Sequence, residues 1–193
     1  MASASEWTGL RLLGDTATLS SQVRHFAQRK PDAPAVLGMT GSLRWRELDT
    51  CADRLANALD RLGMKKGDRL AWLGRNSLIF PIVLLAARRA GAVLTGLNWR
   101  LSPVELTRIL DRTEPALIVG DTEFAGSVPS RFRFVDTEAG LGAFVTGAST
   151  EAVDRSEPGD ISTLFFTSGT TGEPKALAYT SESADRMMFA PNT

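Results

Sequence analysis

The sequence predicts an α/β protein in which a mostly parallel sheet is flanked by helices. The main observation is that short apolar segments, suited to buried strands, alternate with helical segments after residue 68. Such alternation favours parallel strands that are covered by helices on both faces. The chain has 193 residues, of which 43% are hydrophobic and 23% are charged, so it is long enough to bury a sizeable core.

Residues 18–68 are predicted to form a helix, a hairpin and a second helix, after a flexible N-terminus over residues 1–17. The first helix is indicated by apolar residues at helical spacing, namely Leu19, Val23, Phe26 and Ala27. Two apolar segments, residues 35–37 and 43–45, flank a glycine-containing turn, which predicts the hairpin. The second helix is expected over residues 46–62, because its apolar residues form one stripe: Leu48, Ala52, Leu55, Leu59 and Leu62.

Residues 69–175 are predicted to form an α/β subdomain that ends in a glycine-rich loop, and residues 176–193 continue the chain beyond it. Strands are expected at residues 70–73, 92–94, 116–119, 132–135 and 162–166. A buried helix is expected to be capped by Asn76 or Ser77 and to reach Arg89. A capping box, Ser102-Pro103-Val104-Glu105, predicts a further helix through Leu110. Residues 139–158 are rich in small and acidic residues and are expected to be a flexible connection.

The most informative segment is the loop after the last predicted strand, Thr167-Ser168-Gly169-Thr170-Thr171-Gly172-Glu173-Pro174-Lys175. Glycine lets backbone N–H groups approach a ligand closely, hydroxyls donate to anionic oxygens, and the lysine adds a mobile positive charge. In parallel sheets, ligands bind beyond the carboxyl ends of strands, where this loop is expected to lie. The loop therefore predicts a polyphosphate-binding site. It is not a Walker A loop, GxxxxGK followed by Ser or Thr, because Ala176 follows Lys175.

The composition excludes several classes of function. Lysine plus arginine and aspartate plus glutamate each number 22, so net charge favours neither nucleic acid nor an anionic membrane as a partner. The single cysteine, Cys51, rules out an internal disulfide and, with one histidine, makes a zinc site unexpected. Cys51 is expected to pack, and His25 to lie partly exposed on a helix. The chain shows no secretion signal, and its longest apolar run, residues 78–87, is too short to cross a bilayer, so we expect a cytoplasmic location.

The string TSGTTGEPK resembles the phosphate-binding loop of the adenylate-forming superfamily, which contains acyl- and aryl-CoA ligases, luciferases and peptide-synthetase adenylation domains. Segments upstream resemble the N-terminal region of acyl-CoA ligases in order and spacing, so that the likeness covers about residues 18–180: Leu43–Leu48, Lys66–Leu70, Arg75–Ser77, Arg89–Ala92 and Leu97–Leu106. Two positions depart from the family's pattern. Ala176 stands where the family has glycine, and Ser181 stands where it commonly has histidine.

The resemblance implies an incomplete N-terminal domain of the adenylate-forming fold, from a ligase that activates a carboxylic acid with ATP and passes the acyl group to coenzyme A. It implies that ATP is bound by Thr167, Ser168, Gly169, Thr170, Thr171, Gly172 and Lys175. Mg²⁺ and coenzyme A are expected for the full-length enzyme. The family's adenine and ribose motifs, its magnesium-associated acidic residue and its adenylation lysine come later in sequence order. We therefore assign no catalytic residue and no metal ligand here, and expect the chain alone to be inactive.

Other interpretations stay open from the sequence: a non-catalytic module that binds nucleotide or phosphate, an inert truncated product, and an unrelated phosphotransfer enzyme. The helix predicted at residues 46–62 raises a further expectation. In the family that the chain resembles, this helix packs on a sheet supplied largely by later sequence. The leucines of its stripe are therefore expected to be exposed here and to offer a surface for self-association.

Overall fold

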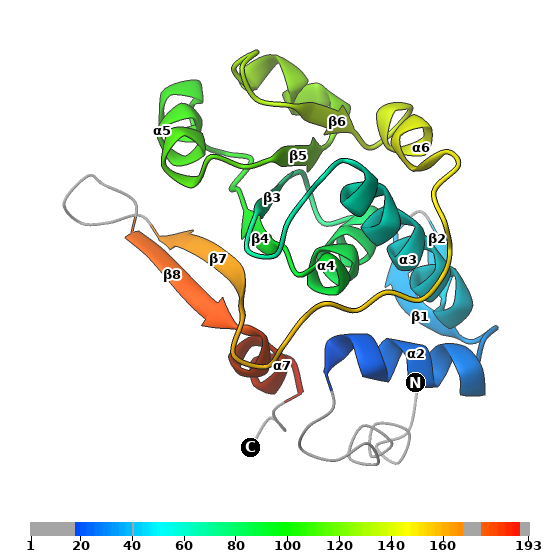
Figure 1. The fold of residues 1–193 in the computed structure, drawn as a ribbon. Coiled ribbons are helices and arrows are strands. Elements are labelled where there is room, and N and C mark those ends of the chain that lie inside the picture. The colour runs from blue at the N-terminus through cyan, green and yellow to red at the C-terminus, as the bar shows by residue number, and fades with distance from the viewer. Residues whose placement is uncertain (1–17, 40, 168–174, 190–193) are drawn as a thin grey trace.

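The computed structural model describes residues 18–39, 41–167 and 175–189 (Figure 1). Its helices are α2 (Leu19–Arg29), α3 (Trp45–Arg61), α4 (Ile79–Ala90), α5 (Pro103–Thr113), α6 (Gly140–Val145) and α7 (Ser181–Phe189), with a 3₁₀ helix η2 (Thr122–Ser127). Its strands are β1 (Pro34–Gly38), β2 (Gly41–Arg44), β3 (Arg69–Leu73), β4 (Val93–Gly96), β5 (Leu117–Gly120), β6 (Phe134–Asp136), β7 (Ile161–Thr167) and β8 (Lys175–Thr180). The N-terminus predicted to be flexible, residues 1–17, lies outside the described residues. None of the helices in the described ranges is long and apolar enough to cross a membrane.

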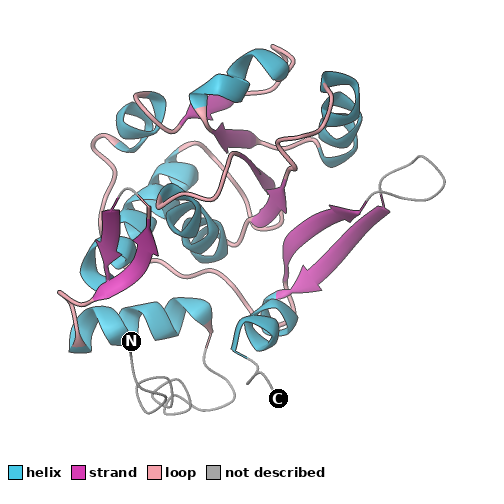
Figure 2. Cartoon of the chain, turned by 180° about the vertical axis from the view of Figure 1, so that it is seen from behind, coloured by secondary structure: helices cyan, strands magenta, loops and turns pink. Residues whose placement is uncertain are grey.

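Within the described residues, the strands form a two-stranded hairpin and a six-stranded sheet (Figure 2). The hairpin pairs β1 with β2 in antiparallel register, as predicted. The order in the larger sheet is β6-β5-β3-β4-β7-β8. Neighbours from β6 to β7 run parallel, and β8 runs antiparallel to β7 at one edge. The predicted mostly parallel α/β fold is therefore confirmed.

Alternate residues of β3 point to opposite faces of the sheet, and different helices cover the two faces. Leu70 and Trp72 belong to a buried cluster that contains side chains of α3 and α4, whereas Ala71 and Leu73 belong to a cluster with side chains of α5. Helix α4 connects β3 to β4, and α5 connects β4 to β5 across β3. The connections that follow β3 and β4 thus leave toward opposite faces. In open α/β sheets, ligands bind at such a point, beyond the carboxyl ends of the strands.

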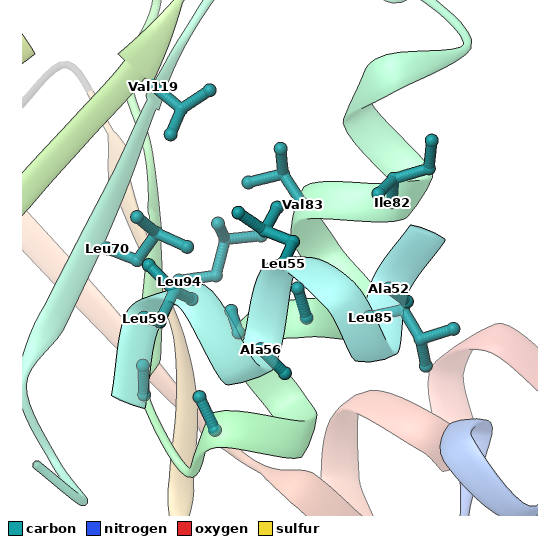
Figure 3. Packing of buried hydrophobic residues seen from close by; sticks show 14 of the residues in the cluster. Ala52, Leu55, Ala56, Leu59, Leu70, Ile82, Val83, Leu85, Leu94 and Val119 are labelled. Carbon is teal, nitrogen blue, oxygen red and sulfur yellow. The ribbon is translucent and has the colours of Figure 1, made fainter. Parts of the chain in front are cut away.

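The expected exposure of the leucine stripe on α3 is wrong. Leu48, Leu55 and Leu59 are 5%, 1% and 0% exposed, and they pack in a cluster that includes Val83 of α4 (Figure 3). Leu62, at the end of the stripe, is half-buried against the same cluster. Helix α4 of this chain supplies the apolar partner, which was expected instead from a sheet formed largely by sequence beyond residue 193. The self-association expected through this helix face therefore loses its physical basis.

The start of α4 also differs from the prediction. Its N-cap residue is Leu78 rather than Asn76 or Ser77, and the Ser77 hydroxyl oxygen accepts a hydrogen bond of 3.3 Å from the backbone N–H of Ile79. Pro81 lies in the first turn of the helix, where a backbone N–H would have no partner within the helix. The Ser77 hydroxyl therefore satisfies the first N–H of the helix from one residue before the N-cap.

Residues 139–158 form an attached segment rather than the predicted flexible connection. The segment contains the short helix α6 and then runs along α3 and α4. The Asn57 side chain of α3 donates to the carbonyl oxygen of Glu151 at 3.0 Å, and the backbone N–H of Arg155 donates to the carbonyl oxygen of Arg89 at 2.9 Å. Composition predicted flexibility because it reports local propensity only. The partners that hold this segment lie far away in the sequence.

Candidate functional site

A cleft of about 1030 Å³ opens at the carboxyl ends of the parallel strands, where the connections after β3 and β4 diverge. Its walls come from the turns after β3 and β4, from the end of β7, and from α4 and α5. The residues used below are Arg75 and Asn76 after β3, Asn98, Trp99 and Arg100 after β4, Phe165 and Phe166 of β7, and Glu105 of α5. The cleft therefore occupies the position at which an α/β sheet of this topology binds ligands.

Two arginines and a tryptophan form a cationic and aromatic wall of the cleft. The guanidinium of Arg75 lies 4.8 Å from the centre of the Trp99 ring, and that of Arg100 lies 4.1 Å from the same ring. The Arg75 guanidinium also donates to the Glu123 carboxylate at 3.2 Å. Cation–π contacts at partly exposed sites contribute roughly 0.5–1 kcal/mol each, so they orient these side chains more than they stabilise the fold.

The carboxylate of Glu105, which borders the cleft, is engaged in the predicted capping box of α5. Its Oε2 accepts from the Ser102 hydroxyl at 2.7 Å and from the Ser102 backbone N–H at 2.9 Å. These hydrogen bonds lower the pKa of Glu105. The capping box is therefore confirmed, and the negative charge of Glu105 is directed toward the helix start.

The β7–β8 hairpin brings together the two ends of the predicted phosphate-binding loop. Thr167 ends β7, Lys175 begins β8, and the two residues are direct partners in the antiparallel register. Phe166, which precedes Thr167, lines the cleft, so the loop begins at the cleft's border. The other predicted binding residues lie outside the described residues: Ser168, Gly169, Thr170, Thr171 and Gly172.

Cys51 packs against apolar side chains and His25 lies partly exposed on a helix, as predicted. Cys51 on α3 is half-buried among apolar side chains, and this burial raises the pKa of its thiol, which disfavours the reactive thiolate. His25 on α2 is half-buried and contacts the ring of Phe26 edge to face, with 5.4 Å between the ring centres. Neither residue lines the cleft.

No role for Arg75, Trp99 or Arg100 was predicted from the sequence, although the structure brings these residues together at the cleft. A signal existed, because an aromatic residue and a cation lie a few residues after a buried strand, in the run Asn98-Trp99-Arg100. This signal identifies one wall only. The contact between Arg75 and Trp99 depends on β3 and β4 being neighbours in the sheet, a long-range fact that local patterns do not contain.

A family model described as AMP-binding enzyme matches residues 23–190, most of the chain. The chain belongs to this family of AMP-binding enzymes. The predicted resemblance to adenylate-forming enzymes, and to acyl- and aryl-CoA ligases among them, is confirmed. The match also excludes the alternative that an unrelated phosphotransfer enzyme carries a coincidental loop.

Curated proteins related to this AMP-binding chain include ligases of several kinds. A fatty acid–[acyl-carrier-protein] ligase from Streptomyces coeruleorubidus is 32% identical over 181 residues, which are 90% of this chain and 34% of the relative. A feruloyl-CoA synthase from Amycolatopsis is 33% identical over 160 residues, 80% of this chain and 31% of the relative. A 3-hydroxybenzoate–CoA ligase from Aromatoleum is 32% identical over 168 residues, 80% of this chain and 32% of the relative. The chain thus spans about a third of the length of these relatives.

Solved structures of AMP-binding enzymes share the fold. The inhibitor-bound N-terminal domain of FACL13 from Mycobacterium tuberculosis superposes with a TM-score of 0.77 at 25% identity, covering 85% of this chain and 44% of that chain. A benzoate CoA ligase from Burkholderia xenovorans gives a TM-score of 0.76 at 18% identity, over 86% of this chain and 35% of that chain. The chain therefore has the architecture of the N-terminal part of the adenylate-forming fold.

Proposed function

We propose that this chain is the N-terminal, phosphate-binding part of an ATP-dependent acyl-CoA ligase. Such an enzyme converts a carboxylic acid to an acyl-adenylate and then transfers the acyl group to the thiol of coenzyme A. The observation that carries the proposal is the position of the motif TSGTTGEPK within the range that the family model matches. The pairing of Thr167 with Lys175, one position beyond Phe166 of the cleft wall, supports it.

The chemistry of the first half-reaction explains the composition of the loop. A carboxylate oxygen attacks the α-phosphorus of ATP, the bond to the bridging oxygen breaks, and pyrophosphate leaves with additional negative charge. Backbone N–H groups near Gly169 and Gly172, the loop hydroxyls and the Lys175 ammonium would hold the β- and γ-phosphates and stabilise that charge. The attacking carboxylate is already ionised at neutral pH, so the step requires no general base.

The residues of this chain fit the implied small molecules to different degrees. Hydroxyls, glycine N–H groups and a lysine suit the phosphates of ATP. For Mg²⁺, the part of the chain that the structure describes contains no group of three or more His, Cys, Asp or Glu side chains, so we assign the ion no ligand here. Coenzyme A would supply the accepting thiol in the full-length enzyme.

The relatives' names favour a broad class of acids and two kinds of acceptor. They name fatty acid, feruloyl and 3-hydroxybenzoate groups, and they name either CoA or an acyl carrier protein as the acceptor. We therefore propose a fatty or aromatic acid as the substrate, with coenzyme A as the first candidate acceptor. A carrier-protein thiol is the second candidate, which the relative from Streptomyces coeruleorubidus favours.

The two residues that depart from the family's pattern lie in β8 and at the start of α7. Ala176 is exposed in β8 opposite Phe166, so its methyl group is accommodated in an extended strand. Ser181 is 2% exposed at the start of α7, and its backbone N–H donates to the carbonyl oxygen of Asp160 at 2.8 Å. A small buried serine thus stands where the family commonly has histidine. We propose that the choice of acid differs from that of family members with histidine at this position.

Two further proposals concern organisation and location. We propose a boundary near residue 68 between the N-terminal segment and the α/β subdomain. One buried cluster includes Leu59 and Leu70, so the two parts share a core.

We also propose a cytoplasmic location, which the single cysteine, Cys51, supports.

Incubation of the chain with ATP, Mg²⁺ and a panel of fatty and aromatic acids is expected to yield no acyl-adenylate by mass spectrometry. Binding of ATP is expected to be weak, with a dissociation constant on the order of 1 mM, because only phosphate contacts are proposed here. A full-length enzyme that contains the chain is expected to form the acyl-adenylate. An adenylate made by the chain alone would contradict the proposal.

The same assay separates the alternatives. ATP binding by the chain, without adenylate formation by a full-length protein that contains it, would indicate a non-catalytic nucleotide-binding module. Absence of ATP binding would indicate an inert product.

A further inference from the structure

One buried carboxylate, that of Asp185 on α7, joins three helices that are far apart in the sequence: α2, α4 and α7. Its Oδ2 accepts a hydrogen bond of 3.2 Å from the backbone N–H of Leu19, the first residue of α2. Its Oδ1 lies 3.2 Å from the NH2 group of Arg88 on α4. The side chains of Arg88 and Asp185 are 3% and 9% exposed. The carboxylate also faces the N-terminus of α2, where the helix dipole favours negative charge.

This ion pair is costly to bury. Within the described residues, Arg88 Nε and NH2 and Asp185 Oδ1 have no partner in hydrogen-bond geometry, although the two charges are at ion-pair distance. Loss of hydration raises the pKa of Asp185 and lowers the pKa of Arg88. The nearby carboxylate of Asp154 adds to the rise for Asp185 and opposes the fall for Arg88. A buried pair with such geometry is a weak source of stability. Its clearest structural effect is to set where α7 sits.

The position of α7 matters because the β7–β8 hairpin forms one edge of the sheet, where β4 is its neighbouring strand within the described residues. Strand β7 pairs with β4 through three residues of β4, Leu94 to Gly96, and the last of these pairs with Phe165. Beyond Phe165, the ladder between β7 and β8 continues to Thr167 and Lys175. Helix α7 follows β8 directly and lies at the foot of the hairpin (Figure 1). The hairpin is thus held at its middle by β4 and at its base by α7.

We propose that Arg88 and Asp185 are positioning residues that fix α7 against α4 and α2 and thereby orient the β7–β8 hairpin, whose far end carries Thr167 and Lys175. The effect on phosphate binding rests on the proposed function, whereas the effect on the hairpin does not. The pair acts through the backbone of β8 and touches no ligand itself.

The test uses a double variant of the 193-residue chain, Arg88→Met with Asp185→Leu, which replaces both charges by apolar groups of similar volume. We expect its unfolding temperature to stay within about 4 °C of the unchanged protein, because removal of both partners leaves no unpaired buried charge. Hydrogen exchange of the β8 amides is expected to be at least about tenfold faster, with β3 amides unchanged. Inorganic pyrophosphate, titrated by NMR, is expected to bind several-fold more weakly. The control is Glu182→Gln, which removes an exposed ion pair with Arg186 on the same helix and is expected to change none of these readouts.

Arg88→Met with Asp185→Asn provides a second variant, since it keeps an oxygen that can accept from Leu19 and again leaves no unpaired buried charge. It is expected to accelerate exchange in β8 in the same way. Unchanged β8 exchange in either variant, or faster exchange in β8 and β3 together, would overturn the positioning role. If the unchanged chain does not bind pyrophosphate, the proposed function fails while β8 exchange still decides the positioning role. If it binds, and both variants bind equally well, the positioning role fails while the proposed function stands.

Discussion

In a full-length enzyme that contains this chain, Lys175→Ala is expected to slow adenylate formation by roughly 10²–10³-fold, the usual loss when one electrostatic donor is removed from a transition state. Lys175 begins β8 and is the register partner of Thr167, at the end of the hairpin that borders the cleft. Its ammonium would face the phosphates that gain charge as pyrophosphate leaves. Transfer of the acyl group to the thiol occurs after pyrophosphate has left, so that step is expected to lose much less.

Separate assays of the two half-reactions measure this difference. The first follows acid-dependent pyrophosphate release, and the second starts from synthetic acyl-adenylate with coenzyme A. Lys65→Ala, at an exposed lysine of the turn after α3, is the matched control and is expected to change neither rate. Equal losses in the two half-reactions of the Lys175 variant would contradict the assignment of Lys175 to pyrophosphate.

Arg89→Met is expected to lower the free energy of unfolding by about 3–5 kcal/mol, because it breaks a buried ion-pair network on one side. Arg89 on α4 is 0% exposed. Its NH1 lies 2.9 Å from Asp53 Oδ1 and donates to the Asp49 carbonyl oxygen at 2.8 Å, and its NH2 donates to the Asp49 carboxylate. Arg24 of α2 donates to the other side of Asp53 at 2.8 Å. The network therefore ties α2, α3 and α4 together.

Chemical denaturation of the variant measures the loss. Arg131→Gln serves as the control, because Arg131 pairs with Asp111 at the surface, where both side chains are more than half exposed. Exposed pairs contribute about 0–1 kcal/mol, so the control is expected to be nearly neutral. If Arg89→Met costs no more than the control, the network does not hold the three helices together as described.

Local sequence patterns predicted most elements of this fold because their causes are local. The apolar stripe from Leu48 to Leu62 identified α3, and the Ser102–Glu105 capping box identified the start of α5. The partner of that stripe was not predictable in the same way. Burial of Leu55 against Val83 depends on α3 packing on α4. The spacing of residues along one helix does not reveal such a tertiary contact. The attachment of residues 139–158 was missed for the same reason.

The same difference between local patterns and tertiary contacts applies to the candidate site. A phosphate-binding role for the loop could be proposed from the sequence because its residue types stand together in one string, from Thr167 to Lys175. The cleft beside it could not, because Arg75 and Trp99 meet only once β3 and β4 are neighbours in the sheet. The buried pair of Arg88 with Asp185 joins residues that are nearly a hundred positions apart, and neither residue has a motif around it.

An NMR titration of the isotope-labelled chain with inorganic pyrophosphate tests whether this hairpin holds the phosphates of ATP. Amide shifts are expected to concentrate on Thr167, Lys175 and the residues between them, and to disappear in the Lys175→Ala variant. Shifts that are absent at millimolar pyrophosphate, or that concentrate elsewhere on the chain, would contradict the assignment of this hairpin to the phosphates of ATP.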